Sequence, residues 1–122
     1  MFVRSAMIGA ILFLVMQTSV SAQFNVQDLY LDCRAPERSP KWALCIAYIS
    51  GVGNMMQLVG STQLAHPNEW YAPLGICGDP SNGAMMQAFI NWAEKNPQEW
   101  STPRIIGVPN ALISTWPCQQ KK

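Results

Sequence analysis

The sequence predicts an all-α fold, a small four-to-five-helix bundle linked by two disulfides. Apolar residues recur at helical spacing, capping residues and prolines bound these stretches, and all four cysteines follow an export signal. No internal repeat, charge run or low-complexity stretch divides the chain, and 122 residues suffice for only one small domain. We therefore expect a single helical domain behind the signal.

The N-terminus has the composition of a secretory signal peptide. Arg4 precedes an apolar run over residues 6–16, and a Val-Ser-Ala triplet ending at Ala22 supplies the small residues of a cleavage site. The apolar run is well short of the roughly 20 residues that span a bilayer, which argues against an uncleaved anchor. We expect a signal peptide over residues 1–22 and a mature domain over residues 23–122.

The charge balance excludes several classes of protein. Eight basic and seven acidic residues give a net charge of +1, and Arg4 leaves with the signal, so the mature chain is neutral. A neutral chain has no field with which to attract nucleic acid or an anionic membrane. Its hydrophobic fraction of 49% argues against intrinsic disorder.

Two helices are expected in the first half of the mature chain. Asn25 can cap a short helix over Val26–Cys33. Ser39 can cap a second helix, predicted over Pro40–Val59 and ending at Gly60, with its proline at the first helical position, where the missing N–H costs nothing.

The second helix has one regular apolar face. Steps of three and four residues place six side chains on it: Trp42, Cys45, Ile49, Val52, Met56 and Val59. Gly51 and Gly53 inside this helix each cost about 1 kcal/mol against alanine. They suggest either the close approach of another backbone or a local kink.

Two more helices are expected after a long connection over residues 60–80. One is predicted over Asn82–Asn96, because Pro97 stops it. The other is predicted over Pro103–Trp116, where Pro109 should kink the helix by removing one backbone hydrogen bond. Their apolar faces consist of Met85, Phe89 and Trp92 in the first and Ile105, Val108, Leu112 and Trp116 in the second.

The four cysteines of an exported domain this small predict two disulfides. Helical hairpins bring Cys33 near Cys45 and Cys77 near Cys118, so we favour these pairs among the three possible connectivities. Each bond should stabilise the fold by roughly 3–4 kcal/mol on a chain-entropy model. A zinc site is a poor alternative, since there is no C-x-x-C pair and only His66 adds a nitrogen ligand.

No residue pattern predicts catalysis or a cofactor. His66 is the only histidine, and a general base needs a nucleophile and an orienting partner, which the oxidised cysteines and scattered carboxylates do not supply. The methionine pairs at 55–56 and 85–86 have a copper(I) alternative, but one member of each pair fits a core face. We expect no metal, no cofactor and no enzyme activity.

The long connection contains the best candidate for a partner-binding surface. Trp70 and Tyr71 are adjacent in a proline-bounded loop, and Trp100 lies in the turn between the last two helices. Rigid aromatic side chains in loops are good interface anchors, although they can also fold back over a small core. The predicted partner-binding residues are His66, Glu69, Trp70, Tyr71 and Trp100.

Four short motifs follow the order and spacing of a known family. They are the L-x-x-x-C of Leu29 and Cys33, the stretch CIAYISGV at 45–52 against C-x-G-Y-x-x-G-V, Cys77 and Pro80 before the helix that Pro97 stops, and residues 111–118 against A-L-x-x-x-[FW]-P-C. Over residues 26–118 the chain thus resembles the Rap/Tai family of periplasmic immunity proteins. It departs from the family pattern at Ala47, where a glycine is usual, at 53–55, where Gly-Asn-Met replaces Ala-Asp-Gly, and at Pro109.

The resemblance implies a small, exported, mostly helical inhibitor. Such proteins bind and block peptidoglycan amidase toxins delivered by type VI secretion, and so protect the producing cell and its kin. We therefore expect a non-enzymatic immunity protein of the periplasm whose partner is a cell-wall amidase, with a homodimer left open. The alternative is another periplasmic interaction protein, either a lysozyme-type inhibitor or a small helical chaperone.

Overall fold

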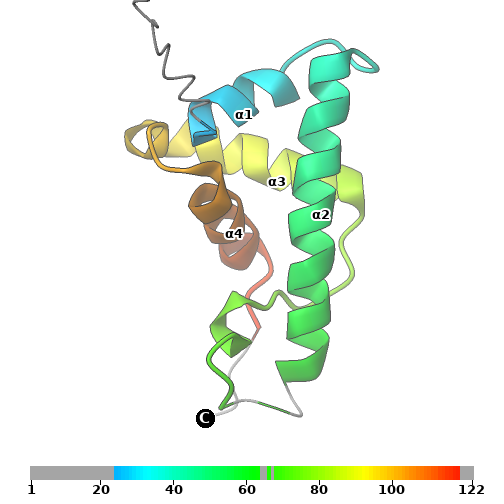
Figure 1. Ribbon diagram of the computed structural model, residues 1–122, viewed down its shortest axis with the longest axis vertical. Coiled ribbons are helices and arrows are strands. Elements are labelled where there is room, and N and C mark those ends of the chain that lie inside the picture. The colour runs from blue at the N-terminus through cyan, green and yellow to red at the C-terminus, as the bar shows by residue number, and fades with distance from the viewer. Residues whose placement is uncertain (1–23, 64–65, 67, 119–122) are drawn as a thin grey trace, which may run out of the picture.

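The computed structural model describes residues 24–63, 66 and 68–118, and the regular secondary structure in this part of the chain is helical (Figure 1). It contains four α-helices and two short 3-10 helices: α1 (Val26–Cys33), α2 (Pro40–Gln63), η1 (Ala72–Leu74), α3 (Asn82–Lys95), η2 (Pro97–Glu99) and α4 (Arg104–Thr115). The only β-type pairings within these residues are two isolated bridges. The all-α prediction is confirmed, whereas the predicted signal peptide lies outside the described residues.

The predicted caps hold the starts of the first two helices. The side chain of Asn25 accepts a hydrogen bond from the backbone N–H of Asp28 at 2.8 Å. Ser39 accepts one from the backbone N–H of Trp42 at 3.3 Å, directly before α2. Each cap satisfies a backbone donor that has no partner inside its own helix.

The predicted end of α2 at Gly60 is wrong, because the helix continues to Gln63. Gly60 is buried, and a Cβ built on it would meet the backbone of Ile76. This glycine therefore permits a close crossing between α2 and a distant segment and does not terminate the helix. The backbone N–H of Ile76 also donates to the carbonyl of Met56 at 3.1 Å, which fixes the crossing.

The predicted bounds of α1 are confirmed, whereas α3 is one residue shorter than predicted at its C-terminal end and α4 one residue shorter at each end. In α3, Asn96 is the C-cap and lies outside the helix, and in α4 the flanking residues Pro103 and Trp116 are caps. The structure places Pro109 inside α4, which continues through it. The long connection contains η1, which the sequence pattern did not reveal.

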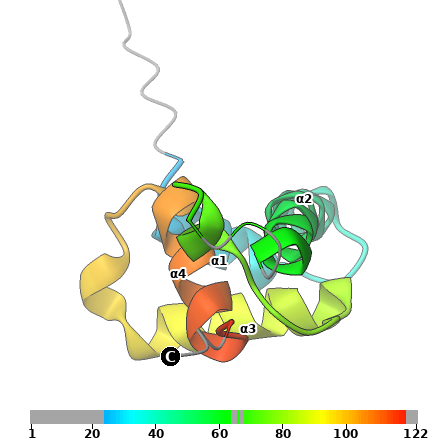
Figure 2. The same ribbon diagram turned by 90° about the horizontal axis from the view of Figure 1, so that it is seen from below.

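The core lies where α3 packs behind α1, α2 and α4, an arrangement visible in Figures 1 and 2. Its largest fully buried side chains come from all four α-helices and the segment before α3: Phe89, Leu29, Ile49, Ile76, Met85, Leu112, Val26, Val108 and Cys45. The start of α1 also pairs with the start of α4, since Val26 N donates to Thr102 O at 2.9 Å and Arg104 N donates to Phe24 O at 2.9 Å.

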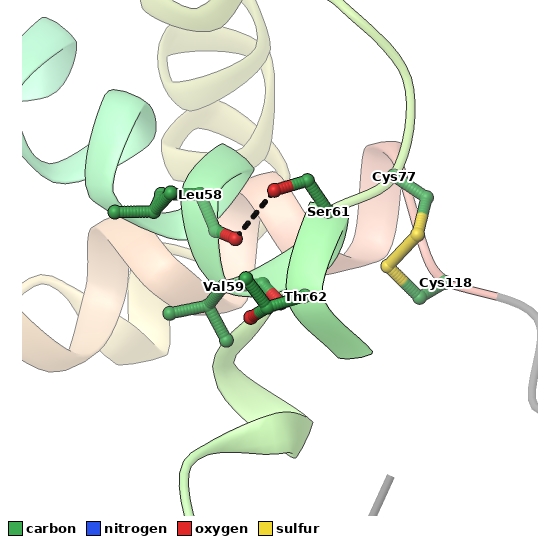
Figure 3. Close-up of a disulfide and its surroundings, with 6 residues drawn as sticks. All are labelled: Leu58, Val59, Ser61, Thr62, Cys77 and Cys118. Atoms are coloured by element: carbon green, nitrogen blue, oxygen red, sulfur yellow. Dashed lines mark hydrogen bonds between the residues drawn. A yellow bond between two sulfur atoms is a disulfide. The ribbon is translucent and has the colours of Figure 1, made fainter. Parts of the chain in front are cut away.

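Both predicted disulfides are present. Cys33 is bonded to Cys45, closing the hairpin of α1 and α2 with Cα atoms 5.1 Å apart. Cys77 is bonded to Cys118, with Cα atoms 4.8 Å apart, and this bond ties the segment before α3 to the residues after α4 (Figure 3). Each disulfide therefore joins a different pair of segments: one joins α1 to α2, and the other joins the segment before α3 to the residues after α4.

Candidate protein-binding surfaces

The loop that follows α2 presents the most exposed aromatic residue of the described chain. Trp70 is 83% exposed, and its ring meets the ring of Tyr71 edge-on at a centroid distance of 5.7 Å. Successive turns fix the loop: Ala72 N donates to Glu69 O at 3.0 Å, and Leu74 N donates to Tyr71 O at 2.9 Å. The indole is therefore held outward on an ordered support.

The base of this loop packs against α2 through glycine and alanine. Gly75 lies on Gly60, where a Cβ on either residue would enter the backbone of the other segment, and Ala72 is 3% exposed. His66 continues the backbone of α2 by donating to Thr62 O at 2.9 Å, and its side chain is exposed. The structure thus brings four of the five predicted residues into one loop: His66, Glu69, Trp70 and Tyr71.

Trp100 lies elsewhere, beside α1 and α3. Its ring stacks on Tyr30 at 5.6 Å, and its Nε1–H donates to the carbonyl of Ala93 at 2.8 Å. The hydroxyl of Tyr30 donates to Glu94 Oε1 at 3.0 Å, and this hydrogen bond raises the pKa of Tyr30. Trp100 therefore packs on both α1 and α3. It follows η2, which lies apart from the segment of η1 in Figure 1.

A groove lies between α1, the first half of α2 and the start of α4. The guanidinium of Arg104 is sandwiched between two rings, 4.4 Å from the centroid of Phe24 and 4.2 Å from that of Tyr48. Such stacking holds the charged group over apolar surface while its edges stay free to donate hydrogen bonds. The groove has a volume of about 620 Å³ and is lined by Phe24, Asp28, Asp32, Leu44, Ala47, Tyr48 and Arg104.

A row of residues on one face of α2 runs from this groove along the helix. We call it the α2 stripe, and it consists of the exposed Leu44, Gly51, Met55 and Leu58 and the partly buried Tyr48. Leu44 is 65% exposed, Met55 61% and Leu58 59%, although each is large and apolar. Contiguous apolar residues on the surface of a small protein mark interaction sites.

The sequence prediction missed the α2 stripe, although a signal for it existed. Once one apolar face had been assigned to α2, the remaining apolar residues still recurred at steps of three and four. A helix apolar on two faces is an unusual feature for a small domain, because only one face is needed for its core.

Among the described residues, no group of three or more His, Cys, Asp or Glu side chains lies together as a metal site would require. Exposed aromatic and aliphatic residues on a rigid, disulfide-linked helical frame instead define a protein-binding domain.

The family comparison agrees with this class. Residues 25–118 match the model of the Rap1a immunity proteins, so the chain belongs to this family, and the resemblance seen in its motifs is confirmed. Membership implies an immunity function against a toxin and a protein toxin as partner. A search of curated proteins and a search of solved structures each found no match.

Proposed function

We propose that this chain is a non-enzymatic periplasmic immunity protein that binds and blocks a peptidoglycan amidase-type toxin of a type VI secretion system. The observation that supports this most is the match to an immunity family over nearly the whole described domain. The candidate loop also suits binding better than turnover, since its histidine is exposed and, within the described residues, no hydrogen bond joins its side chain to a carboxylate or nucleophile.

The redox chemistry of the cysteines and the proposed target both support a periplasmic location. Two disulfides persist in an oxidising compartment such as the periplasm, and all four cysteines are paired. An amidase that cleaves peptidoglycan acts in the same compartment. The inhibitor and its toxin would therefore meet after export of the immunity protein.

The loop of Trp70 is the proposed contact with the toxin. A large ring that is already exposed and held by an ordered turn loses little conformational entropy when it enters a pocket of the partner. Trp70 would anchor the complex, with Tyr71 and His66 beside it. Because the mature chain is neutral, recognition would rest on shape and aromatic contact more than on electrostatic steering.

The proposal is tested by protection and by binding. Periplasmic expression should protect cells against the cognate amidase, and the purified inhibitor should abolish cleavage of peptidoglycan by that amidase in vitro. A small cysteine–histidine amidase encoded beside this protein is the first candidate for the assay. An inhibitor that leaves amidase activity unchanged against all such candidates would contradict the proposal.

A single substitution tests the contact. Trp70→Ala should weaken amidase binding by about 2 kcal/mol or more, roughly thirtyfold in Kd, because central aromatic anchors dominate interfaces. Leu31→Ala is the matched control, since Leu31 is 56% exposed on α1, outside the loop. Equal losses in the two variants, measured by calorimetry with the same amidase, would remove the loop from the interface.

A further inference from the structure

The guanidinium of Arg104 is fixed at the groove between α1, α2 and α4. It stacks on the rings of Phe24 and Tyr48, at 4.4 and 4.2 Å from their centroids. The backbone holds two of these groups together, because Arg104 N donates to Phe24 O at 2.9 Å and Asn25 pairs with Pro103 in an isolated bridge. Stacking uses the flat faces of the guanidinium and leaves the N–H donors on its edge for other groups.

The described part of the chain supplies no anion to those donors. Its one salt bridge joins Arg34 to Glu94 at 3.5 Å, and it does not involve Arg104. A guanidinium that rests on aromatic rings has given up part of its hydration. Its free donors therefore favour a carboxylate, which accepts two parallel hydrogen bonds from the edge of an arginine.

The opposite wall of the groove is acidic. Asp28 and Asp32 line it from α1, four residues apart and thus on the same face of that helix. Like charges at this spacing repel each other, and within the described residues neither carboxylate takes part in a salt bridge. The groove therefore presents a cation and two anions that do not neutralise one another, which suits a ligand with both signs of charge.

The rest of the groove has the size and the apolar surface of a ligand site. Its volume of about 620 Å³ lies within the usual range of small-molecule sites, and Leu44 and Ala47 of α2 supply apolar lining. Contacts join α1 to both α2 and α4, and α1 lies between them in Figure 2. The disulfide between Cys33 and Cys45 also joins α1 to α2, so two walls of the groove are linked covalently.

We propose that this groove binds a short peptide with a free carboxylate and a free amine, as in the stem peptides of peptidoglycan. The edge of Arg104 binds the carboxylate, Asp28 and Asp32 bind the ammonium, and Leu44 contacts the aliphatic part between them. The charges of the ligand are inferred from the groove alone. The choice of the cell wall as its source rests on the proposed function.

The groove is separate from the proposed toxin contact. It is lined by residues of the first half of α2, whereas the loop of Trp70 follows the other end of that helix (Figure 1). With 24 residues, α2 is about 36 Å long. Peptide binding and toxin binding can therefore be measured independently, and the failure of one does not imply the failure of the other.

The first experiment titrates the mature protein with three forms of one peptide and follows its amide chemical shifts by NMR. The probe is N-acetyl-Ala-Ala-Lys with a free carboxylate, and the controls are its C-terminal amide and its form with an acetylated lysine side chain. Each control should bind at least about tenfold more weakly, because it lacks one of the two charges. Equal Kd values for the three forms, or no binding of any of them, would overturn the proposal.

The second experiment assigns each charge of the peptide to its wall. Arg104→Gln should remove the preference for the free carboxylate over the amide and keep the preference for the free amine. The double variant Asp28→Asn and Asp32→Asn should do the reverse. Arg34→Gln is the matched control, since Arg34 lies outside the groove and pairs with Glu94.

Arg104→Lys gives a second measure if Arg104→Gln does not fold. It keeps the charge and loses the paired donors, so its preference for the free carboxylate should fall without vanishing. An arginine variant that is folded by circular dichroism and discriminates as the wild type does would overturn the role of Arg104.

The third experiment tests the source of the ligand and its independence from the toxin. A stem tripeptide that ends in diaminopimelic acid should bind more tightly than N-acetyl-Ala-Ala-Lys, and weaker binding would overturn the cell wall as the source. Adding the cognate amidase should leave peptide binding unchanged. Displacement of the peptide by the amidase would make the groove part of the toxin contact and overturn a separate ligand site.

Discussion

The two faces of α2 have similar residues and opposite environments. On one face, Cys45 and Ile49 are completely buried and Met56 is 4% exposed, whereas Leu44 and Met55 on the other face are more than half exposed. Both faces repeat at steps of three and four residues. Periodicity therefore shows how many apolar faces a helix has, but the positions of the other helices decide which face joins the core.

The largest expected effect is a difference in the free energy of unfolding between substitutions on the two faces of α2. Ile49→Ala should lower the free energy of unfolding by about 2–5 kcal/mol, because it leaves a cavity among side chains that are fully buried. Leu44→Ala should change it by less than about 0.5 kcal/mol, because Leu44 is 65% exposed. Urea unfolding at low protein concentration measures both values.

Similar losses of stability in the two variants would contradict this difference between the two faces of α2. They would mean that Leu44 and the groove around it contribute to the core.

The features that the sequence predicted depend on local chemistry. Asn25 and Ser39 cap the helices that follow them, since a capping side chain reaches only the next turn. The disulfide pairs were also predictable, because short hairpins leave few geometries for Cys33 and Cys45, and the helix order places Cys77 near Cys118.

The features that the sequence did not predict depend on partners far away in the chain. In the sequence, Gly60 resembles the end of a helix, but in the structure the backbone of Ile76 crosses α2 at this residue. Trp70 and Trp100 both lie in turns near prolines, yet Trp100 stacks on Tyr30, whereas Trp70 meets Tyr71 edge-on and stays exposed. A loop sequence does not contain the information that distinguishes a covered tryptophan from an exposed one.

A smaller effect is expected where α2 crosses the segment before α3. Gly60→Ala should lower the free energy of unfolding by about 1–3 kcal/mol, because the added Cβ would collide with the backbone of Ile76, which cannot rotate away. Because Gly75 rests on Gly60, the variant should also loosen the support of the Trp70 loop. Hydrogen exchange of the amide of Ile76, which bonds to Met56, measures this loosening directly. Unchanged stability would mean that the crossing relaxes without cost.

The smallest changes in stability are expected at the other two glycines of α2, Gly53 and Gly51. Gly53→Ala should leave the free energy of unfolding nearly unchanged, because two effects oppose each other. Alanine stabilises the helix by roughly 1 kcal/mol, but the flexible end of the buried Met85 side chain must move, at a similar cost in free energy. Gly51→Ala should stabilise the monomer by about 0.5–1 kcal/mol, since its Cβ meets nothing. The difference between the two variants, measured by urea unfolding, thus reports packing against Met85 and, to a smaller extent, Leu112. A loss of stability in Gly51→Ala would contradict the open space beside this residue and would place an intramolecular neighbour there.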